Sequence, residues 1–115
     1  MAYDIPKFAD QPPQQAYDDA EPDLVSVYAR VAQILIQMQG CLAQGYPFVF
    51  GFTVYDSFES PEVAQTGVVP MPAPGEAGLG GHCVVAVGYD DSTRRFVIRN
   101  SWGPSWVKRL LHHAL

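Results

Sequence analysis

Two apolar runs separated by a short polar turn constrain the fold of this chain most strongly. Val84–Tyr89 and Phe96–Arg99 are rich in β-branched and aromatic residues, and Asp90–Arg94 between them has the composition of a turn. This pattern predicts an antiparallel hairpin. If the turn centres near Ser92, residues whose numbers sum to about 184 face each other across the two strands.

The predicted register brings a histidine and an asparagine together. His82 opens the first strand and Asn100 follows the second, and both are even-numbered, so their side chains project from the same face. A side-chain amide can then hold an imidazole in one tautomer and one orientation, which is half of a nucleophilic catalytic site. Trp102 is expected to cover the pair and to strengthen its hydrogen bond by excluding water.

These residues resemble two motifs of the papain-like cysteine peptidases, most closely those of bacterial members. Both motifs stand in the order and spacing of that family, and the resemblance runs from about residue 2 to residue 106. The histidine motif is Gly81-His82-Cys83-Val84 followed by Gly88-Tyr89, and the asparagine motif is Asn100-Ser101-Trp102-Gly103-Pro104-Ser105-Trp106.

The resemblance implies a fold of two lobes with the active cleft between them. In the family, a mostly helical first lobe carries the nucleophilic cysteine and the oxyanion-hole glutamine, and a β-barrel-like second lobe carries the histidine and the asparagine. This chain matches the second lobe and the crossover before it. We therefore expect an α+β fold with an antiparallel β-barrel-like sheet and one short helix, incomplete at both ends. Residues 1–23 would form an extended crossover arm and residues 24–115 the lobe, with the match fading after residue 106.

The resemblance also assigns roles to individual residues. His82 would be the general base and Asn100 the residue that orients it. No cofactor and no metal ion is implied. The expected supporting residues are Ser101, Trp102 and Trp106, and the expected residues of the substrate pocket are Gly80, Gly81 and Cys83.

The family's nucleophile is missing from the sequence. Its motif, Cys-Gly-Ser/Ala-Cys-Trp/Tyr, lies about 130–150 residues before the histidine and asparagine, whereas 81 residues precede His82 and none of them spells the motif. Cys41 and Cys83 are predicted to be buried free thiols, because free cysteine is among the most buried residue types. A Cys41–Cys83 disulfide is the alternative. Peptidase activity is therefore expected only when the missing N-terminal lobe is supplied.

Hydrophobic spacing predicts the remaining elements. Residues 24–31 read as a first strand, residues 34–44 as a helix that Gly45 ends, and residues 48–55 as a strand with its even-numbered side chains on one face. Residues 56–81 are rich in proline and glycine and are predicted to form a long loop. Because this loop ends at His82, it would rim the active cleft.

The C-terminal residues depart from the family. After Trp106 the family continues into a Gly-Tyr-Phe strand, and Val107–Leu115 does not, so a barrel strand is expected to be lost. One choice of synonymous codons for Lys108–Leu115 spells the family's ending in a shifted reading frame. The alternative to a peptidase lobe is therefore a non-catalytic remnant or binding module from a truncated or frameshifted gene. His112 and His113 are not expected to be metal ligands, because no cysteine or carboxylate is spaced beside them.

Charge and composition limit the partners of the chain. The formal net charge is −5 without a basic cluster, which argues against nucleic acid and anionic membranes. No apolar run approaches the roughly 18 residues of a membrane span. The expected partners are a peptide or protein substrate and the missing N-terminal lobe. Self-association through the exposed face of the lobe is also expected, and the sequence does not indicate a compartment.

Overall fold

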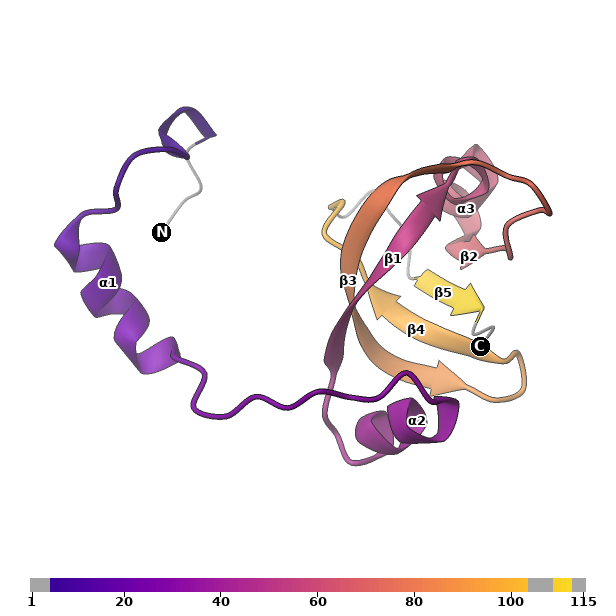
Figure 1. Cartoon of the computed structure of the whole chain (residues 1–115), viewed down its shortest axis with the longest axis horizontal. Coiled ribbons are helices and arrows are strands. Elements are labelled where there is room, and N and C mark those ends of the chain that lie inside the picture. Colours follow the sequence, from indigo (N-terminus) through magenta and orange to yellow (C-terminus); the bar gives the residue numbers. More distant parts are fainter. Residues whose placement is uncertain (1–4, 104–108, 113–115) are drawn as a thin grey trace. The chain divides into compact units, whose positions relative to one another are not determined.

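The computed structural model describes residues 5–103 and 109–112, which fall into two compact units that divide between Arg30 and Val31 (Figure 1). The first unit contains η1 (Ile5–Lys7), α1 (Gln14–Ala20) and η2 (Glu21–Asp23). Hydrogen bonds between side chains one turn apart, Gln14 to Asp18 and Gln15 to Asp19, support α1. The arm expected over residues 1–23 is therefore partly helical rather than extended.

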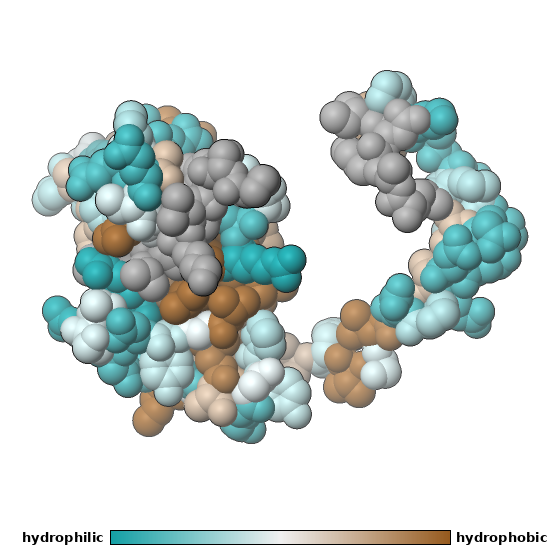
Figure 2. All heavy atoms as spheres, turned by 180° about the vertical axis from the view of Figure 1, so that it is seen from behind, coloured by the Kyte–Doolittle hydropathy of each residue, from teal (hydrophilic) through white to brown (hydrophobic). Residues whose placement is uncertain are grey.

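The predicted strand over residues 24–31 is wrong. Residues 24–34 form no helix or strand, and the apolar side chains of residues 24–28 are exposed. Figure 2 shows such apolar surface on both units. The most exposed apolar residues of the first unit are Phe8, Leu24, Val25, Val27 and Tyr28, and those of the second are Ile36, Tyr46 and Val49. Self-association through such surface stays a prediction.

A five-stranded sheet forms the frame of the second unit. Its strand order is β1-β3-β4-β5-β2, and all neighbours are antiparallel except β5 and β2. In the described part of the chain the sheet is open, with β1 and β2 as its end strands, rather than closed into a barrel. The strands are β1 (Phe48–Tyr55), β2 (Val68–Val69), β3 (Gly78–Asp90), β4 (Arg95–Arg99) and β5 (Arg109–His112).

Strand β5 corrects the expectation that the C-terminal strand is lost. Residues 109–112 pair with β4 on one side and with β2 on the other (Figure 1). Their sequence differs from that of the family, but a ladder is made by backbone N–H and C=O groups, which every residue except proline supplies. A strand can therefore persist where the side-chain motif does not.

The β3–β4 hairpin confirms the predicted register at the end that carries His82. Val85 faces Arg99 and Ala86 faces Ile98, as expected. A bulge at Val87 then shifts the pairing by one residue towards the turn.

The side chain of Asp90 caps the hairpin turn. Its Oδ1 accepts hydrogen bonds from the Ser92 backbone N–H at 2.9 Å and from the Ser92 hydroxyl at 2.6 Å. These bonds, the one from the hydroxyl foremost, hold the pKa of Asp90 below its ordinary value of 3.8. Since the folded-state pKa is lowered, Asp90 stabilises the fold above its ordinary pKa, and this contribution is lost as the pH falls through the folded-state value.

An Asp90→Ala variant should be less stable than the wild type at neutral pH and should lose less stability on acidification. Chemical denaturation at a series of pH values, from neutral to about pH 2, measures this difference. Asp10→Ala is the control, because Asp10 is exposed and its side chain makes no hydrogen bond described in the structure. Equal pH slopes for Asp90→Ala and the wild type would contradict the assignment.

Two apolar clusters fill the inner face of the sheet. Helix α2 (Leu35–Ala43) covers one cluster with Leu35, Met38 and Leu42. Gly45 follows the helix with φ +87°, so both the predicted helix and its end are confirmed. The cluster beneath α2 is Val84, Ala86, Phe96 and Ile98, and the second cluster is Val54, Phe58, Val63 and Val69.

No helix in residues 5–103 has the length and hydropathy needed to cross a membrane.

The loop predicted over residues 56–81 contains regular structure. It includes η3 (Asp56–Glu59), α3 (Pro61–Thr66), β2 and the start of β3. The Oγ of Ser60 accepts a hydrogen bond from the Val63 N–H at 3.3 Å, and Pro61 is the first residue of α3. A serine followed by a proline signals the start of a helix, but the many prolines and glycines in residues 56–81 favour the prediction of a loop. These elements supply Phe58, Val63 and Val69 to the second cluster.

Candidate active site

His82 and Asn100 meet on the inner face of the sheet, as predicted. His82 lies in β3, Asn100 directly follows β4, and the His82 Nε2 to Asn100 Oδ1 distance is 2.8 Å. The same oxygen accepts the Ser101 backbone N–H at 2.8 Å. Because two groups converge on an amide oxygen that can only accept, Nε2 must be the donor. The Nδ1 of His82 is therefore the ring nitrogen left for a reacting group.

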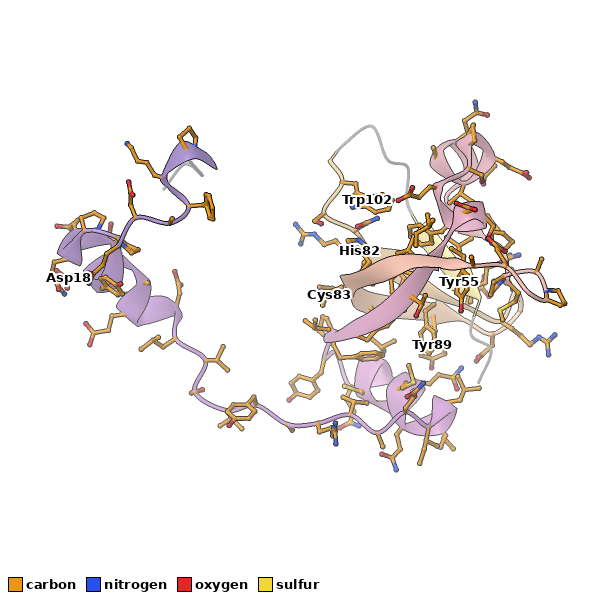
Figure 3. All side chains as sticks on the ribbon, turned by 45° about the horizontal axis from the view of Figure 1, so that its top comes forward. Asp18, Tyr55, His82, Cys83, Tyr89 and Trp102 are labelled. Carbon is orange, nitrogen blue, oxygen red and sulfur yellow. The ribbon has the colours of Figure 1, made fainter. Side chains whose placement is uncertain are left out.

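Aromatic rings surround His82. The Trp102 ring stacks on the imidazole with centroids 4.9 Å apart and planes 25° apart, and Figure 3 shows the two side chains together. Phe52, which pairs with His82 across β1 and β3, places its ring edge-on at 5.9 Å. Phe58 in turn packs edge-on against Trp102 at 5.4 Å. Trp102 thus stacks on the imidazole as a covering residue would, and its role in excluding water from the hydrogen bond stays a prediction.

Among the described residues, the Asn100 amide is held through its oxygen, and its buried Nδ2 has no hydrogen-bond partner there. A buried donor without a partner costs about 1–3 kcal/mol. Such groups are rare in native proteins. Rotating the amide would place the NH2 group against the Ser101 N–H, so the observed orientation is the favourable one.

The predicted burial of both thiols is wrong for Cys83. Both cysteines are free, Cys83 is exposed, and Cys41 is half-buried with its Sγ 3.3 Å from the Tyr46 carbonyl oxygen. Neighbouring residues of a strand alternate between faces, so the Cys83 side chain leaves β3 on the side opposite His82, as Figure 3 shows. Cys41 lines a surface hollow of about 440 Å³ along α2, and none of the predicted site residues lines it. Neither cysteine therefore stands in for the missing nucleophile.

The exposure difference predicts which thiol reacts first. Iodoacetamide should modify Cys83 faster than Cys41 in the folded chain, because Cys83 is exposed, whereas Cys41 is half-buried with its thiol directed at the Tyr46 carbonyl oxygen. Mass spectrometry of Cys83→Ser and Cys41→Ser variants separates the two rates. If Cys41 reacts as fast in the folded protein as in protein unfolded by denaturant, the described burial of Cys41 is incorrect.

The glycines before His82 leave bare backbone beside it. Gly80 and Gly81 pair with Val54 and Thr53 of β1, and both glycines are exposed. A Cβ added at either would have no described atom within 4 Å apart from those of the adjacent residues. Gly78 differs, because a Cβ there would lie 2.7 Å from the Thr53 side chain. The packing of this lobe therefore does not require glycine at residues 80 and 81. Their role in a substrate pocket, like that of Cys83, stays a prediction.

Sequence reasoning missed two residues whose rings contact the site. Phe52 packs against His82 and Phe58 against Trp102, and both contacts join segments that are distant in the sequence. The predicted site residue Trp106 and the side chains of His112 and His113 lie outside the described residues. In residues 5–103, no group of three His, Cys, Asp or Glu side chains could hold a metal ion.

Comparisons with known proteins found a matching family and related sequences. Residues 8–111 match the model of the Peptidase_C39 like family. An uncharacterised peptidase C1-like protein of Acanthamoeba polyphaga mimivirus is 38% identical over 112 residues, which is 90% of this chain and 36% of that protein. A cathepsin B-like protein of Giardia intestinalis is 34% identical over 82 residues, which is 69% of this chain and 26% of that protein.

A solved structure is also similar. Xylellain, a cysteine protease from Xylella fastidiosa, superposes with a TM-score of 0.78 and 39% identity, over 90% of this chain and 40% of that chain. The chain thus spans two fifths or less of the length of each of these relatives. The extent of the family match, the identity to the relatives and the shared fold lead to one assignment. The chain belongs to the Peptidase_C39 like family and to the papain-like cysteine peptidases.

Proposed function

We propose that this chain supplies the histidine and asparagine of a cysteine peptidase site, and that a separate cysteine-bearing lobe supplies the nucleophile. The observation that carries the proposal is the 2.8 Å hydrogen bond between His82 and Asn100 beneath Trp102. It leaves Nδ1 of an oriented imidazole available for a thiol. The two-lobed architecture that the family resemblance implies places such a thiol on the first lobe.

The proposed reaction uses His82 first as a base and then as an acid. Its Nδ1 takes the proton of the cysteine thiol, and the imidazolium formed stabilises the thiolate. The thiolate attacks the peptide carbonyl carbon, and Nδ1–H then protonates the leaving amine as the C–N bond breaks. A water molecule, deprotonated by Nδ1, hydrolyses the resulting thioester and restores the thiol. Asn100 accepts the Nε2–H bond throughout and keeps the ring from turning.

We infer that the chain alone is inactive. Cys83 leaves β3 on the opposite face, and Cys41 lies in α2 with its thiol directed at the Tyr46 carbonyl. Without a thiolate at Nδ1 there is no covalent step. Substrate binding would also need the other wall of the cleft, so the substrate class proposed is a peptide or protein chain without a stated preference.

A hybrid protein tests the proposal. The chain would replace the segment of xylellain that it matches, which supplies the rest of a cysteine protease. The hybrid is expected to hydrolyse a fluorogenic peptide and to be labelled by a thiol-reactive peptide epoxide, and the chain alone is expected to do neither. Labelling of the isolated chain that disappears in a His82→Ala variant would contradict the proposed division of the site.

A non-catalytic remnant or binding module is the second candidate function. It is favoured by one observation, the departure of residues 107–115 from the family's sequence. This candidate predicts a hybrid that folds but neither hydrolyses peptide nor reacts with the epoxide. Sequencing the coding DNA gives an independent test, because codons at residues 108–115 that cannot spell the family's ending in another frame would exclude a frameshift.

A further inference from the structure

A single carboxylate, that of Glu76, joins two segments beside the site. Its Oε1 accepts the Ser57 backbone N–H at 2.8 Å, and its Oε2 accepts the Ala73 N–H at 2.9 Å. The Glu76 N–H donates to the Ala73 carbonyl at 3.0 Å, closing a turn in which Gly75 has φ +81°. These bonds, the one from Ser57 foremost, lower the pKa of Glu76, so the group is ionised at neutral pH.

The segment that Glu76 binds is connected to His82 by side-chain contacts. Ser57 and Phe58 are neighbours in η3, and Phe58 is 4% exposed. The Phe58 ring meets the Trp102 ring edge-on at 5.4 Å, and the Trp102 ring stacks on His82 at 4.9 Å. A continuous series of contacts therefore runs from the carboxylate to the imidazole.

Trp102 packs against the second cluster, to which Phe58 belongs. Residues 101–103 follow β4 but belong to no helix or strand, so no backbone ladder fixes the indole. Phe58 lies in η3, which is also outside the sheet. The carboxylate bonds tie η3 to the turn that precedes β3, which is the strand that carries His82. Removing them takes away this tie between η3 and β3 without removing a hydrogen bond of the sheet, and leaves Phe58 held by its packing in the second cluster.

We propose that Glu76 is a positioning residue for His82, acting through Ser57, Phe58 and Trp102. Its carboxylate holds η3 against the turn that precedes β3. Phe58 then packs the indole against the imidazole, and the stacked ring keeps the orientation in which Nδ1 is available to a thiol. The inference rests on the proposed function for its catalytic consequence only. The placement of the imidazole can be measured whether or not peptidase activity is reconstituted.

The test is the ring-proton NMR spectrum of His82 in the full chain. Stacking on an indole displaces these protons upfield, and their signals are assigned by their loss in His82→Ala. The upfield displacement is expected to shrink in Glu76→Gln, because the amide NH2 faces a backbone N–H and one bond is lost. Phe58→Leu should have the same effect, and the double variant no more than the larger single effect. Glu59→Gln, which removes a charge from η3 at an exposed residue, should leave the displacement unchanged.

A purely structural role for Glu76 gives a different result. Glu76→Gln would then lower the midpoint of unfolding while the His82 signals stay at their wild-type positions, and the inference would be wrong. If Glu76→Gln does not fold, Glu76→Asp is read in the same way, because the shorter side chain keeps its charge but cannot reach both N–H groups. An inactive hybrid would count against the proposed function without moving the NMR result, so the two failures are distinguishable.

Discussion

Replacing His82 by alanine in the xylellain hybrid is expected to lower kcat/KM for a peptide substrate about a hundredfold to ten-thousandfold. A positioned general acid–base contributes a factor of this size, and here one ring serves both steps. Steady-state kinetics with a fluorogenic peptide measures the loss. Asn100→Ala should cause a smaller loss, because the ring remains but nothing accepts its Nε2–H bond.

The effect should be specific to the histidine of the site. Val49→Ala changes an exposed side chain of β1 and is expected to leave kcat/KM of the hybrid near that of the parent. Circular dichroism confirms that each variant is folded. A His82→Ala hybrid that retains more than about a tenth of the parent rate would refute the role of His82 as the general base.

Replacing Phe96 by alanine is expected to destabilise the second unit by about 3–5 kcal/mol. Phe96 is 4% exposed, and its cluster includes Val84, Ala86 and Ile98. Its ring also packs edge-on against Phe48 at 6.3 Å. The loss combines the transfer of a large side chain with the cavity it leaves, and it approaches the total stability of a small domain, which is about 5–15 kcal/mol. Urea denaturation followed by circular dichroism measures the change in the free energy of unfolding.

The same substitution at an exposed residue provides the control. Phe8 is 79% exposed in the first unit, so Phe8→Ala should change the free energy of unfolding by no more than about 0.5 kcal/mol. If Phe8→Ala and Phe96→Ala destabilise the protein equally, the described core is not the one that holds the fold together.

The hairpin and the His82–Asn100 pair could be predicted because both depend on local rules. The two-residue period of a strand decides which side chains share a face, and a five-residue polar turn between two apolar runs limits the register. Residues 48–55 follow the same period, and their even-numbered side chains do lie towards the core. The family resemblance added the identity of the missing group, which no local rule supplies.

The failed predictions concern features that depend on distant parts of the chain. Residues 24–31 have strand-forming side chains but no neighbouring strand among the described residues, and β-propensity without a partner does not make a strand. The burial of Cys83 was inferred from its residue type, whereas its place opposite the glycine at residue 51 leaves it open. Phe58 contacts Trp102 and Glu76 binds Ser57 only after residues that are distant in the sequence come together, and single-sequence patterns do not encode such contacts.

The bulge at Val87 has a consequence for how the hairpin can vary. Val87 has no partner on β4 and is 44% exposed, so it takes up the one-residue mismatch between the two halves of the ladder. Beyond it the odd-numbered Tyr89 shares the core side with the even-numbered Phe96. Insertions or deletions near the turn can therefore be absorbed at the bulge, and the end of the hairpin that carries His82 keeps its pairing.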